Sequence, residues 1–402
     1  MTPTPTTVRR VLTPALVLAA ALAAQAQQSP NTITTAVPVL TLSPDSRGAA
    51  LGETGAATSP DANSAFYNPG KLGFLTAPAG ASLSYSPWLR AITDDMGLLG
   101  ASGYKKFGQR GALSASLMYF DLGTINFRGE KNEDLGNFNP KEYAVSVAYG
   151  QQLSEKFGVG VAARYIRSNL SVSSGPGVDT RPGNAAAVDL GVYYNTGLTL
   201  GPSEYNLALG AAVTNIGNKI TYTRADQADF LPTSLRLGFA VTRELDAYNK
   251  ITLTADATKL LVPTPYYIDG RAPNDPEVVA KNEEIARKGV VDGIFGSFAD
   301  APGGFREELR EINLSGGVEY WYNDLLSARV GYFYENPKKG DRQYLSLGLG
   351  LRYQVFGVDA AYLVPNSRNN PLANTVRVSL HFNFNGQESA APSDGDAGVP
   401  IN

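Results

Sequence analysis

The stretch Tyr344–Tyr353 reads YLSLGLGLRY, and the stretch Val376–Phe384 reads VRVSLHFNF. From Leu345 in the first and from Val376 in the second, every other side chain is apolar. The positions between them hold only Ser, Gly, Arg, His or Asn. Successive side chains of a β-strand point to opposite faces of the sheet. Each stretch therefore predicts a strand with one wholly apolar face and one small or polar face.

The same alternation recurs past residue 80 and predicts fourteen strands. Their ranges are 80–89, 95–107, 111–121, 142–153, 157–168, 185–195, 204–215, 233–243, 250–260, 311–322, 326–335, 342–353, 356–364 and 375–384. The connections between these strands are alternately long and short. The short ones include Phe107–Arg110, Ser154–Lys156, Glu244–Asn249, Asn323–Leu325 and Gln354–Phe356, and the long ones include 122–141, 169–184, 216–232 and 261–310.

An outer-membrane barrel gives a simple reason for this parity of connections. Lipid tolerates no open sheet edge, and such barrels have short periplasmic turns and long outer loops. We therefore predict an all-β fold, a transmembrane 14-stranded antiparallel up-and-down β-barrel in the cell outer membrane. Because the strand number is even, both termini are expected on the periplasmic side. A soluble all-β protein would also alternate apolar and polar residues, but it predicts no loop parity.

The first 26 residues have the pattern of a secretory signal peptide. Arg9 and Arg10 precede the apolar segment Val11–Ala24, and Ala24-Gln25-Ala26 fits a small-x-small cleavage site. Cleavage there moves the formal net charge from −3 to −5, because only these two arginines are lost. This acidic balance argues against nucleic acid as a partner.

The sequence offers little material for catalysis or metal binding. It contains no cysteine, so disulfides and thiolate metal sites are excluded. Its one histidine, His381, cannot build a zinc site alone, and strand parity predicts that it faces the barrel interior. We therefore predict no cofactor, no metal site, no catalytic residue and no enzymatic activity.

The chain is longer than fourteen strands require, and the excess lies in three places. An N-terminal plug or hatch segment is predicted at 27–79, before the barrel at 80–385. Many inward positions of the barrel are Gly, Ala or Ser, which leaves space for that segment inside. The second region of excess length is the long insertion at 261–310. The third is the acidic tail Gly386–Asn402, which lacks a hydrophobic period and is predicted to be disordered.

Charged side chains of both signs are also predicted to face the interior. They are Arg164, Asp189, Arg236, Asp256, Glu319, Arg329, Arg352, Asp359 and Arg377. Such a set can line a conducting pathway or form an ion-pair network that fills the barrel. We favour the filling network, because mixed charges inside barrels more often pair with one another.

The insertion 261–310 contains a predicted helix over Glu277–Phe298. Its apolar stripe comprises Val278, Val279, Ile285, Val290, Val291, Ile294, Phe295 and Phe298. The stripe can pack on the barrel as a lid or contact a partner protein, and the two are compatible. Val290, Val291, Ile294, Phe295 and Phe298 are the candidate partner-binding residues.

The stretch Leu42–Phe74 reads LSPDSRGAALGETGAATSPDANSAFYNPGKLGF. It resembles the N-terminal signature of the FadL-like barrels, the family of the long-chain fatty-acid transporter. The matching residues are Arg47, Gly48, Gly52, Gly55, Asp61, Ala62, Tyr67, Asn68 and Pro69. The resemblance implies that this segment enters a fourteen-stranded barrel as a plug. On this signature alone, a transporter of hydrophobic small molecules would be the expected function.

Within that family, four strings resemble the PorV (LptO) family of type IX secretion. They are LSPDSR at 42–47, TSPDANS at 58–64, YSPWLR at 85–90 and ALSASLMYF at 112–120. The resemblance implies a non-enzymatic outer-membrane component that associates with the translocon barrel. The resemblance also implies that this component binds secreted cargo proteins through the C-terminal signal domain of the cargo. That cargo would be passed to the surface attachment complex, which contains the sortase PorU. The FadL-like transporter is the alternative function.

Overall fold

The computed structural model describes residues 31–90, 93–128, 132–170, 180–222, 228–268, 270–366 and 375–384. The predicted signal peptide and the predicted acidic tail lie outside these ranges. Within them, no helix combines the length and apolar character that a membrane span requires.

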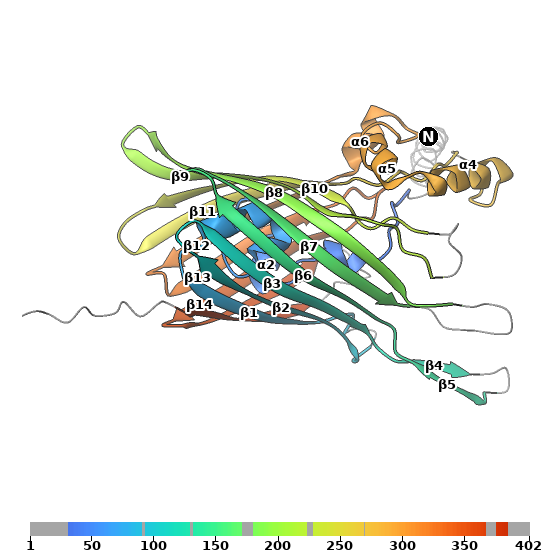
Figure 1. Ribbon diagram of the computed structural model, residues 1–402, viewed down its shortest axis with the longest axis horizontal. Helices are drawn as coiled ribbons and strands as arrows, with labels where there is room; N and C mark the ends of the chain where they lie inside the picture. Colours follow the sequence, from blue (N-terminus) through green and yellow to red (C-terminus); the bar gives the residue numbers. More distant parts are fainter. Residues whose placement is uncertain are drawn as a thin grey trace, which may run out of the picture.

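Fourteen antiparallel strands close into a single barrel, which confirms the predicted fold (Figure 1). They are β1 (Ala79–Pro87), β2 (Met96–Phe107), β3 (Gly111–Leu122), β6 (Lys141–Gln152), β7 (Phe157–Asn169), β8 (Gly183–Leu200), β9 (Ser203–Gly217), β10 (Ser234–Glu244), β11 (Asn249–Leu260), β12 (Ile312–Tyr322), β13 (Leu326–Tyr334), β14 (Gln343–Tyr353), β15 (Phe356–Pro365) and β16 (Val376–Phe384). The barrel closes where β1 pairs with β16, with Ser82 opposite His381.

The predicted strand limits agree with these bounds to within two residues, except at one end of β8. That strand continues five residues further, to Leu200, and its hairpin with β9 projects beyond its neighbours (Figure 1). The predicted loop 122–141 also contains two strands of its own. These are β4 (Ile125–Arg128) and β5 (Asp134–Phe138), which form a separate two-stranded sheet.

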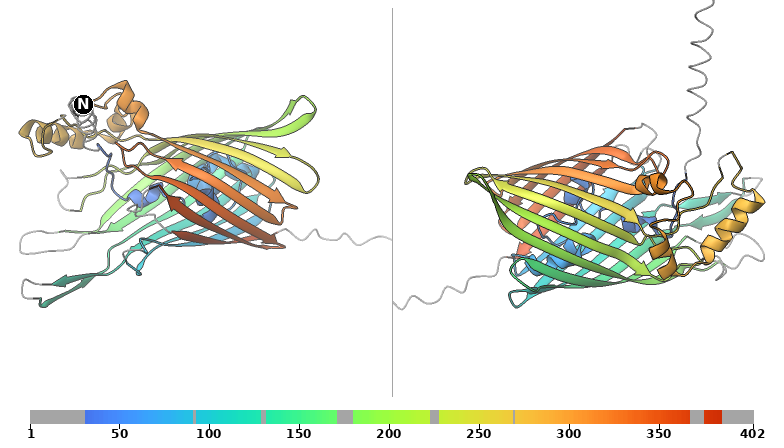
Figure 2. Two further views of the ribbon diagram at one scale, coloured as in Figure 1. Left: turned by 180° about the vertical axis from the view of Figure 1, so that it is seen from behind. Right: turned by 90° about the horizontal axis from the view of Figure 1, so that it is seen from above.

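The two ends of the barrel differ as the connection lengths predict. At the short-turn end, Asn323 and Asp324 both have positive φ, of 52° and 48°, as the two central residues of a type I′ hairpin turn require. The helices of the long insertion lie at the opposite, long-loop end (Figure 2). The outward side chains of the wall are apolar and exposed, whereas the inward side chains that alternate with them are buried. Leu347 is 45% exposed, and its strand neighbour Ser346 is 0% exposed.

The segment before β1 runs through the barrel interior. Its short helical elements are η1 (Pro38–Thr41), α2 (Ser46–Ala50), α3 (Ser64–Tyr67) and η2 (Pro69–Phe74). Figure 1 shows these elements enclosed by the strands. Asn31 donates its backbone N–H to Lys338 O at the long-loop end, whereas Gly73 lies against the backbone of Gln152 at the short-turn end. The segment therefore spans the interior from one end to the other.

This path shows where the described part of the chain begins, whereas both termini lie outside the described residues, so their predicted periplasmic position stays a prediction. The even strand number does bring the start and the end of the sheet together, because Ala79 pairs with Phe384. Asn31, however, lies at the opposite end of the barrel, beside Lys338. The parity of the strands cannot report this, because the chain passes once through the interior before the first strand begins.

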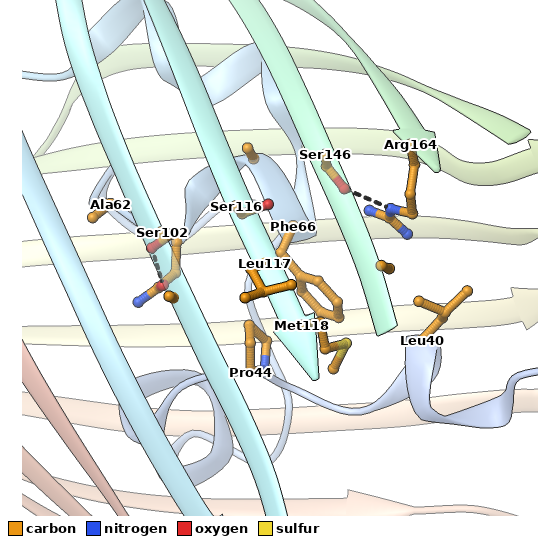
Figure 3. Close-up of a pocket in the computed structure, with 14 residues that line it drawn as sticks. Leu40, Pro44, Ala62, Phe66, Ser102, Ser116, Leu117, Met118, Ser146 and Arg164 are labelled. Atoms are coloured by element: carbon orange, nitrogen blue, oxygen red, sulfur yellow. Dashed lines mark hydrogen bonds between the residues drawn. The ribbon is translucent and has the colours of Figure 1, made fainter. Parts of the chain in front are cut away.

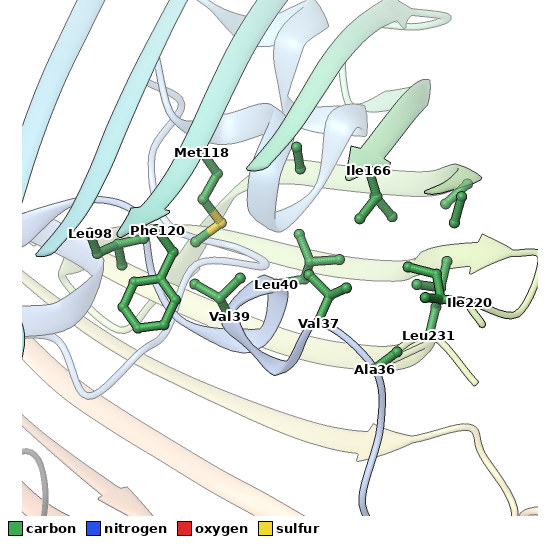
Figure 4. Packing of buried hydrophobic residues seen from close by; sticks show 13 residues of the cluster. Ala36, Val37, Val39, Leu40, Leu98, Met118, Phe120, Ile166, Ile220 and Leu231 are labelled. Carbon is green, nitrogen blue, oxygen red and sulfur yellow. The ribbon is translucent and has the colours of Figure 1, made fainter. Parts of the chain in front are cut away.

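Apolar packing holds residues 36–40 of the interior segment against the wall. Val37, Val39 and Leu40 are buried in one cluster with Met118 and Phe120 of β3 (Figure 4). Burying a Val or Leu side chain stabilises a fold by about 1.5–3 kcal/mol. This cluster therefore contributes to fixing the position of η1 in the barrel.

The insertion between β11 and β12 forms three helices. They are α4 (Pro276–Arg287), α5 (Val290–Gly296) and α6 (Phe305–Arg310). The predicted continuous helix over Glu277–Phe298 is interrupted, because Lys288 and Gly289 have extended backbones with ψ of 144° and 158°. Glycine has a low helix propensity, which agrees with a break at this point. Helix α6 was not predicted.

The outward face of β14 predicts how the wall responds to charge. Leu349→Arg places a charge near the middle of the apolar band and should cost about 2–4 kcal/mol, whereas near an interface the cost is about 0–1 kcal/mol. Tyr353→Arg, on the same face beside the short turn, is the matched control. The yield of folded barrel is measured by heat-modifiable gel mobility. Equal loss of folded protein in both variants would contradict the assignment of a membrane-facing wall.

Candidate functional site

A chain of buried ion pairs joins the interior segment to the barrel wall. Arg47 of α2 donates two hydrogen bonds to Glu319 of β12, from Nε to Oε2 at 2.9 Å and from Nη2 to Oε1 at 2.8 Å. Its remaining Nη1 donates to Asp61 at 2.9 Å. On the wall, Arg329 Nε donates to Glu319 at 2.7 Å and Arg329 Nη1 to Asp359 at 2.9 Å. Bidentate arginine–carboxylate contacts of this kind are strong and geometrically specific.

The chain of ion pairs ends at Asp359 of β15. Its Oδ2 accepts a hydrogen bond from Arg352 at 2.7 Å and lies 2.9 Å from Nε2 of His381. The only histidine of the sequence therefore faces the interior, beside a carboxylate that two arginines already contact. Among the described residues, no cluster of three or more His, Asp or Glu side chains is arranged to hold a metal ion.

Two further carboxylates fix the loop between α2 and α3. Asp256 Oδ2, on β11, accepts from the backbone N–H groups of Gly55 and Ala56 at 2.8 and 2.9 Å. Glu53 lies in the loop itself and accepts from Tyr344 Oη at 2.9 Å and from Ser43 N at 2.8 Å. The interior segment thus binds the wall with its backbone as well as with its side chains.

The nine residues of the predicted plug motif all lie in this interior segment. Gly48 and Gly55 face the ring of Tyr67, and a Cβ on either would overlap it. Gly52 has φ of 68° and lies against the backbone of Tyr332, where a side chain would collide. The Asn68 amide donates to Ala56 O and to Val192 O at 2.9 and 2.8 Å.

The remaining motif residues complete this packing. Asp61 pairs with Arg47, Ala62 is buried, and Pro69 begins η2. Each motif residue described here therefore has a packing or hydrogen-bonding role.

At least two cavities lie between the described part of the segment and the wall. The smaller one, of about 20 Å³, lies among Asn63, Ser102, Ser146 and Arg164 and has room for about one water (Figure 3). The larger one, of about 380 Å³, lies toward the long-loop end, and its lining includes Thr32 and Arg236. The two therefore differ in what they can hold, since only the larger has the volume of a ligand site.

A second buried charge cluster fixes the insertion to the rim. Lys259 Nζ lies 3.0 Å from Glu308 and 2.6 Å from Glu311, and Lys339 Nζ lies 2.5 Å from Glu307 and 3.0 Å from Glu311. These three glutamates and two lysines are nearly or fully inaccessible to solvent. We call them the rim cluster.

The rim cluster also reaches the interior segment. The Asn31 amide donates to Glu307 Oε1 at 3.0 Å and to Pro265 O at 3.1 Å. Burial raises the pKa of Glu307, but the hydrogen bonds from Lys339 and Asn31 outweigh it and hold this pKa below its ordinary value. The start of the described chain and the insertion are thus held by the same carboxylate.

Above the rim cluster, helices α5 and α6 expose large apolar side chains. Val291 is 65% exposed, Phe295 74% and Phe298 49%. The other two candidate partner-binding residues, Val290 and Ile294, are only half-exposed. Phe305, 76% exposed, and Leu309, 52% exposed, belong to the same insertion. The sequence reading missed this pair, although their spacing of four residues is a helical signal.

The ion-pair chain predicts a large effect of one neutral substitution. Glu319→Gln leaves Arg47 and Arg329 facing each other without their shared carboxylate, and breaking a buried pair costs about 3–5 kcal/mol. We expect the variant to unfold at lower denaturant concentration and to expose Lys71 of η2 to trypsin. The control is Asp324→Asn, which removes the exposed pair with Lys250 and should change stability by less than about 1 kcal/mol. Identical behaviour of the two variants would contradict the anchoring role.

The rim cluster predicts acid sensitivity of the insertion. Because the folded-state pKa of Glu307 is lowered, its contribution is fully present above its ordinary pKa of about 4.3 and is lost as the pH falls through the folded value. Hydrogen exchange of residues 305–311, corrected for the intrinsic pH effect, should show protection falling over that acidic range. Glu307→Gln should abolish this part of the pH dependence. Unchanged pH dependence in the variant would assign the effect to other groups.

Comparison with known proteins identifies the family. The family model for "Type IX secretion system protein PorV" matches residues 24–267. No curated protein matches the sequence. Among solved structures, the toluene transporter TbuX of Ralstonia pickettii aligns at TM-score 0.47 and 12% identity, over 86% of this chain and 99% of that one.

Two further solved barrels are similar to this chain at the same level. The P. putida toluene transporter TodX gives TM-score 0.48 and 11% identity, over 84% of this chain and 98% of that one. A Pseudomonas aeruginosa FadL homologue aligns at TM-score 0.43 and 11% identity, over 89% of this chain and 100% of that one.

The family match covers more than half of the 402 residues. It contains the whole interior segment and the barrel strands from β1 to β11, and it ends within the insertion. The chain therefore belongs to the PorV family of outer-membrane proteins of the type IX secretion system.

Proposed function

We propose that this barrel binds secreted cargo at its cell-surface end and delivers it to the surface attachment complex. Its expected partners are the translocon barrel of the type IX system, the C-terminal signal domains of cargo proteins and a PorU-like sortase complex. In this orientation the long-loop end is extracellular, and the short turns and Phe384 are periplasmic. The proposal rests on membership of the PorV family, whose members are secretion components.

The exposed apolar face of the insertion is the observation that carries the proposal. Aromatic side chains such as Phe295 and Phe305 are 74% and 76% exposed, on helices that project from the long-loop end. Exposed aromatic groups of this size are typical of protein-docking surfaces. The buried rim cluster holds the base of the insertion. Because the insertion is already fixed, its apolar face should lose little conformational entropy when a partner binds.

A FadL-like transporter of hydrophobic small molecules is the alternative function. Sites for such molecules are mostly apolar, with a few polar groups. Many residues around the larger cavity carry a hydroxyl, amide or charged group, including Thr258, Asn313 and Arg236, but most of its exposed lining is apolar. Below it, the interior segment is tied to the wall by ion pairs. The ion-paired segment favours a function at the surface over transport through the interior.

The decisive experiment combines substitution of the apolar face with two readouts. Phe295→Ser together with Phe298→Ser should leave the barrel folded, because both side chains are exposed. The variant should strand cargo in the periplasm and weaken its copurification with the barrel. One central aromatic commonly contributes about 2 kcal/mol, which corresponds to roughly a 30-fold loss of affinity. Uptake of labelled fatty acid should not change.

The matched control is Ile125→Ser, which removes another exposed apolar side chain at the long-loop end, on β4. It should secrete normally. Normal secretion by the double phenylalanine variant would contradict docking on this face. Normal secretion with lost fatty-acid uptake in a strain lacking the protein would instead establish the transporter function.

A further inference from the structure

A short open segment lies at the long-loop mouth of the barrel. Residues 31–36 read NTITTA and are fixed at both ends: Asn31 N donates to Lys338 O at 2.8 Å and Ala36 N to Phe230 O at 2.9 Å. Between these anchors, no backbone N–H or C=O of Thr32–Thr35 has a hydrogen-bond partner within the described residues. Exposure alternates from Thr32 to Thr35, as it does along a strand.

The open segment borders the larger cavity. Thr32 to Thr35 line one side of this 380 Å³ space, and side chains of the wall strands β9 to β12 line the other. The volume falls within the roughly 300–1,000 Å³ of binding sites in proteins. Thr214, Thr258, Asn313 and Ser315 supply polar groups from the wall strands.

Charged side chains of both signs line this cavity, and Arg236 is one of its arginines. Only Nη1 of Arg236 is engaged in hydrogen bonds, with Glu53 O at 2.7 Å and with Asp256 Oδ2 at 3.5 Å. Its Nε and Nη2 donate no hydrogen bond within the described residues, and the guanidinium lies over the Tyr67 ring, 5.6 Å from the ring centroid. Arg342, on the same cavity, uses Nε and Nη2 for Glu335 and leaves Nη1 unpaired. Unpaired guanidinium donors facing a cavity suit a carboxylate, which accepts two parallel N–H bonds.

We propose that the open segment Thr32–Thr35 and the adjoining cavity bind an extended peptide segment that carries a carboxylate. The peptide would pair its backbone with the open segment, as a strand added to a free edge does. Its carboxylate would lie at Arg236. Thr and Ile are strong strand formers, so the open segment suits this role. The identification of the peptide's source as a secreted protein rests on the proposed function.

A saccharide is the other ligand that a hydroxyl-rich cavity could hold. The unpaired backbone groups decide between the two. A row of N–H and C=O groups along four residues repeats at the spacing of another polypeptide backbone, and a sugar does not share that repeat. The peptide is therefore the occupant whose backbone can pair with the open groups on one edge of the segment.

The test uses the purified full chain in detergent and three fluorescein-labelled octapeptides of alternating Thr and Val. One ends in a free carboxylate, one in an amide, and one in an amide with an internal Asp. Fluorescence anisotropy should show that at least one carboxylate form binds about tenfold more tightly than the plain amide. Tighter binding of the first peptide would mean that the bound carboxylate is a chain terminus. Tighter binding of the third would mean that it is an acidic side chain.

Two substitutions locate the binding. Thr34→Pro removes one backbone N–H and should weaken every peptide about fivefold to tenfold. Its matched control, Thr34→Val, keeps the N–H and should bind like the parent chain. Arg236→Gln should abolish the preference for carboxylate. Heat-modifiable mobility confirms that each variant retains its barrel.

Three results would overturn the proposal. They are no binding of any peptide at millimolar concentration, equal binding by Thr34→Pro and Thr34→Val, and binding of maltotriose in place of the peptides. The variant Phe295→Ser with Phe298→Ser should bind peptide normally, whatever its effect on secretion. A failure of the docking face and a failure of the peptide site are therefore distinguishable.

Discussion

The bidentate contact between Arg47 and Glu319 is the interaction on which the rest of the interior depends. Both side chains are nearly inaccessible to solvent, with 9% and 3% of their surface exposed, and an unpaired buried charge costs several kcal/mol. On the wall, Glu319 forms an ion pair with Arg329, and Arg329 also pairs with Asp359. The interior segment supplies the second arginine. The segment and the wall therefore complete each other's electrostatics, and the small inward residues of the strands provide the room in which the segment fits.

This arrangement moves the proposed activity to the surface. The lipid requires a closed barrel, and the ion pairs fix a chain segment through its interior. At the long-loop end, Asn31 and Lys339 both contact Glu307, so the interior segment, the wall and the insertion meet at one carboxylate. The exposed aromatic face of α5 and α6 and the open segment Thr32–Thr35 both lie at this end of the barrel. A secretion component of the PorV family can thus present two binding surfaces on one rigid support.

The sequence alone predicted the strands well, because a period of two residues is a local property. It predicted which charges face inward, such as Glu319 and Asp359, but not their partners, since Arg47 lies 272 residues away from Glu319. Helix α6 and the hairpin of β4 and β5 were missed, because both are short and lie within loops. The path of the interior segment was also invisible, since Asn31 is placed at the long-loop end by tertiary contacts with Lys338 and Pro265. The exposed Phe305 shows the same limit, because exposure depends on how the insertion packs.

If the ion-paired interior segment closes the barrel, the intact protein should not conduct ions. Single-channel recording of the purified protein in a planar lipid bilayer measures this. We expect no steady conductance from the intact chain at neutral pH, and steady open steps once residues 31–75 are deleted. A stable open conductance of the intact chain, of the same size as that of the deletion variant, would contradict this closure.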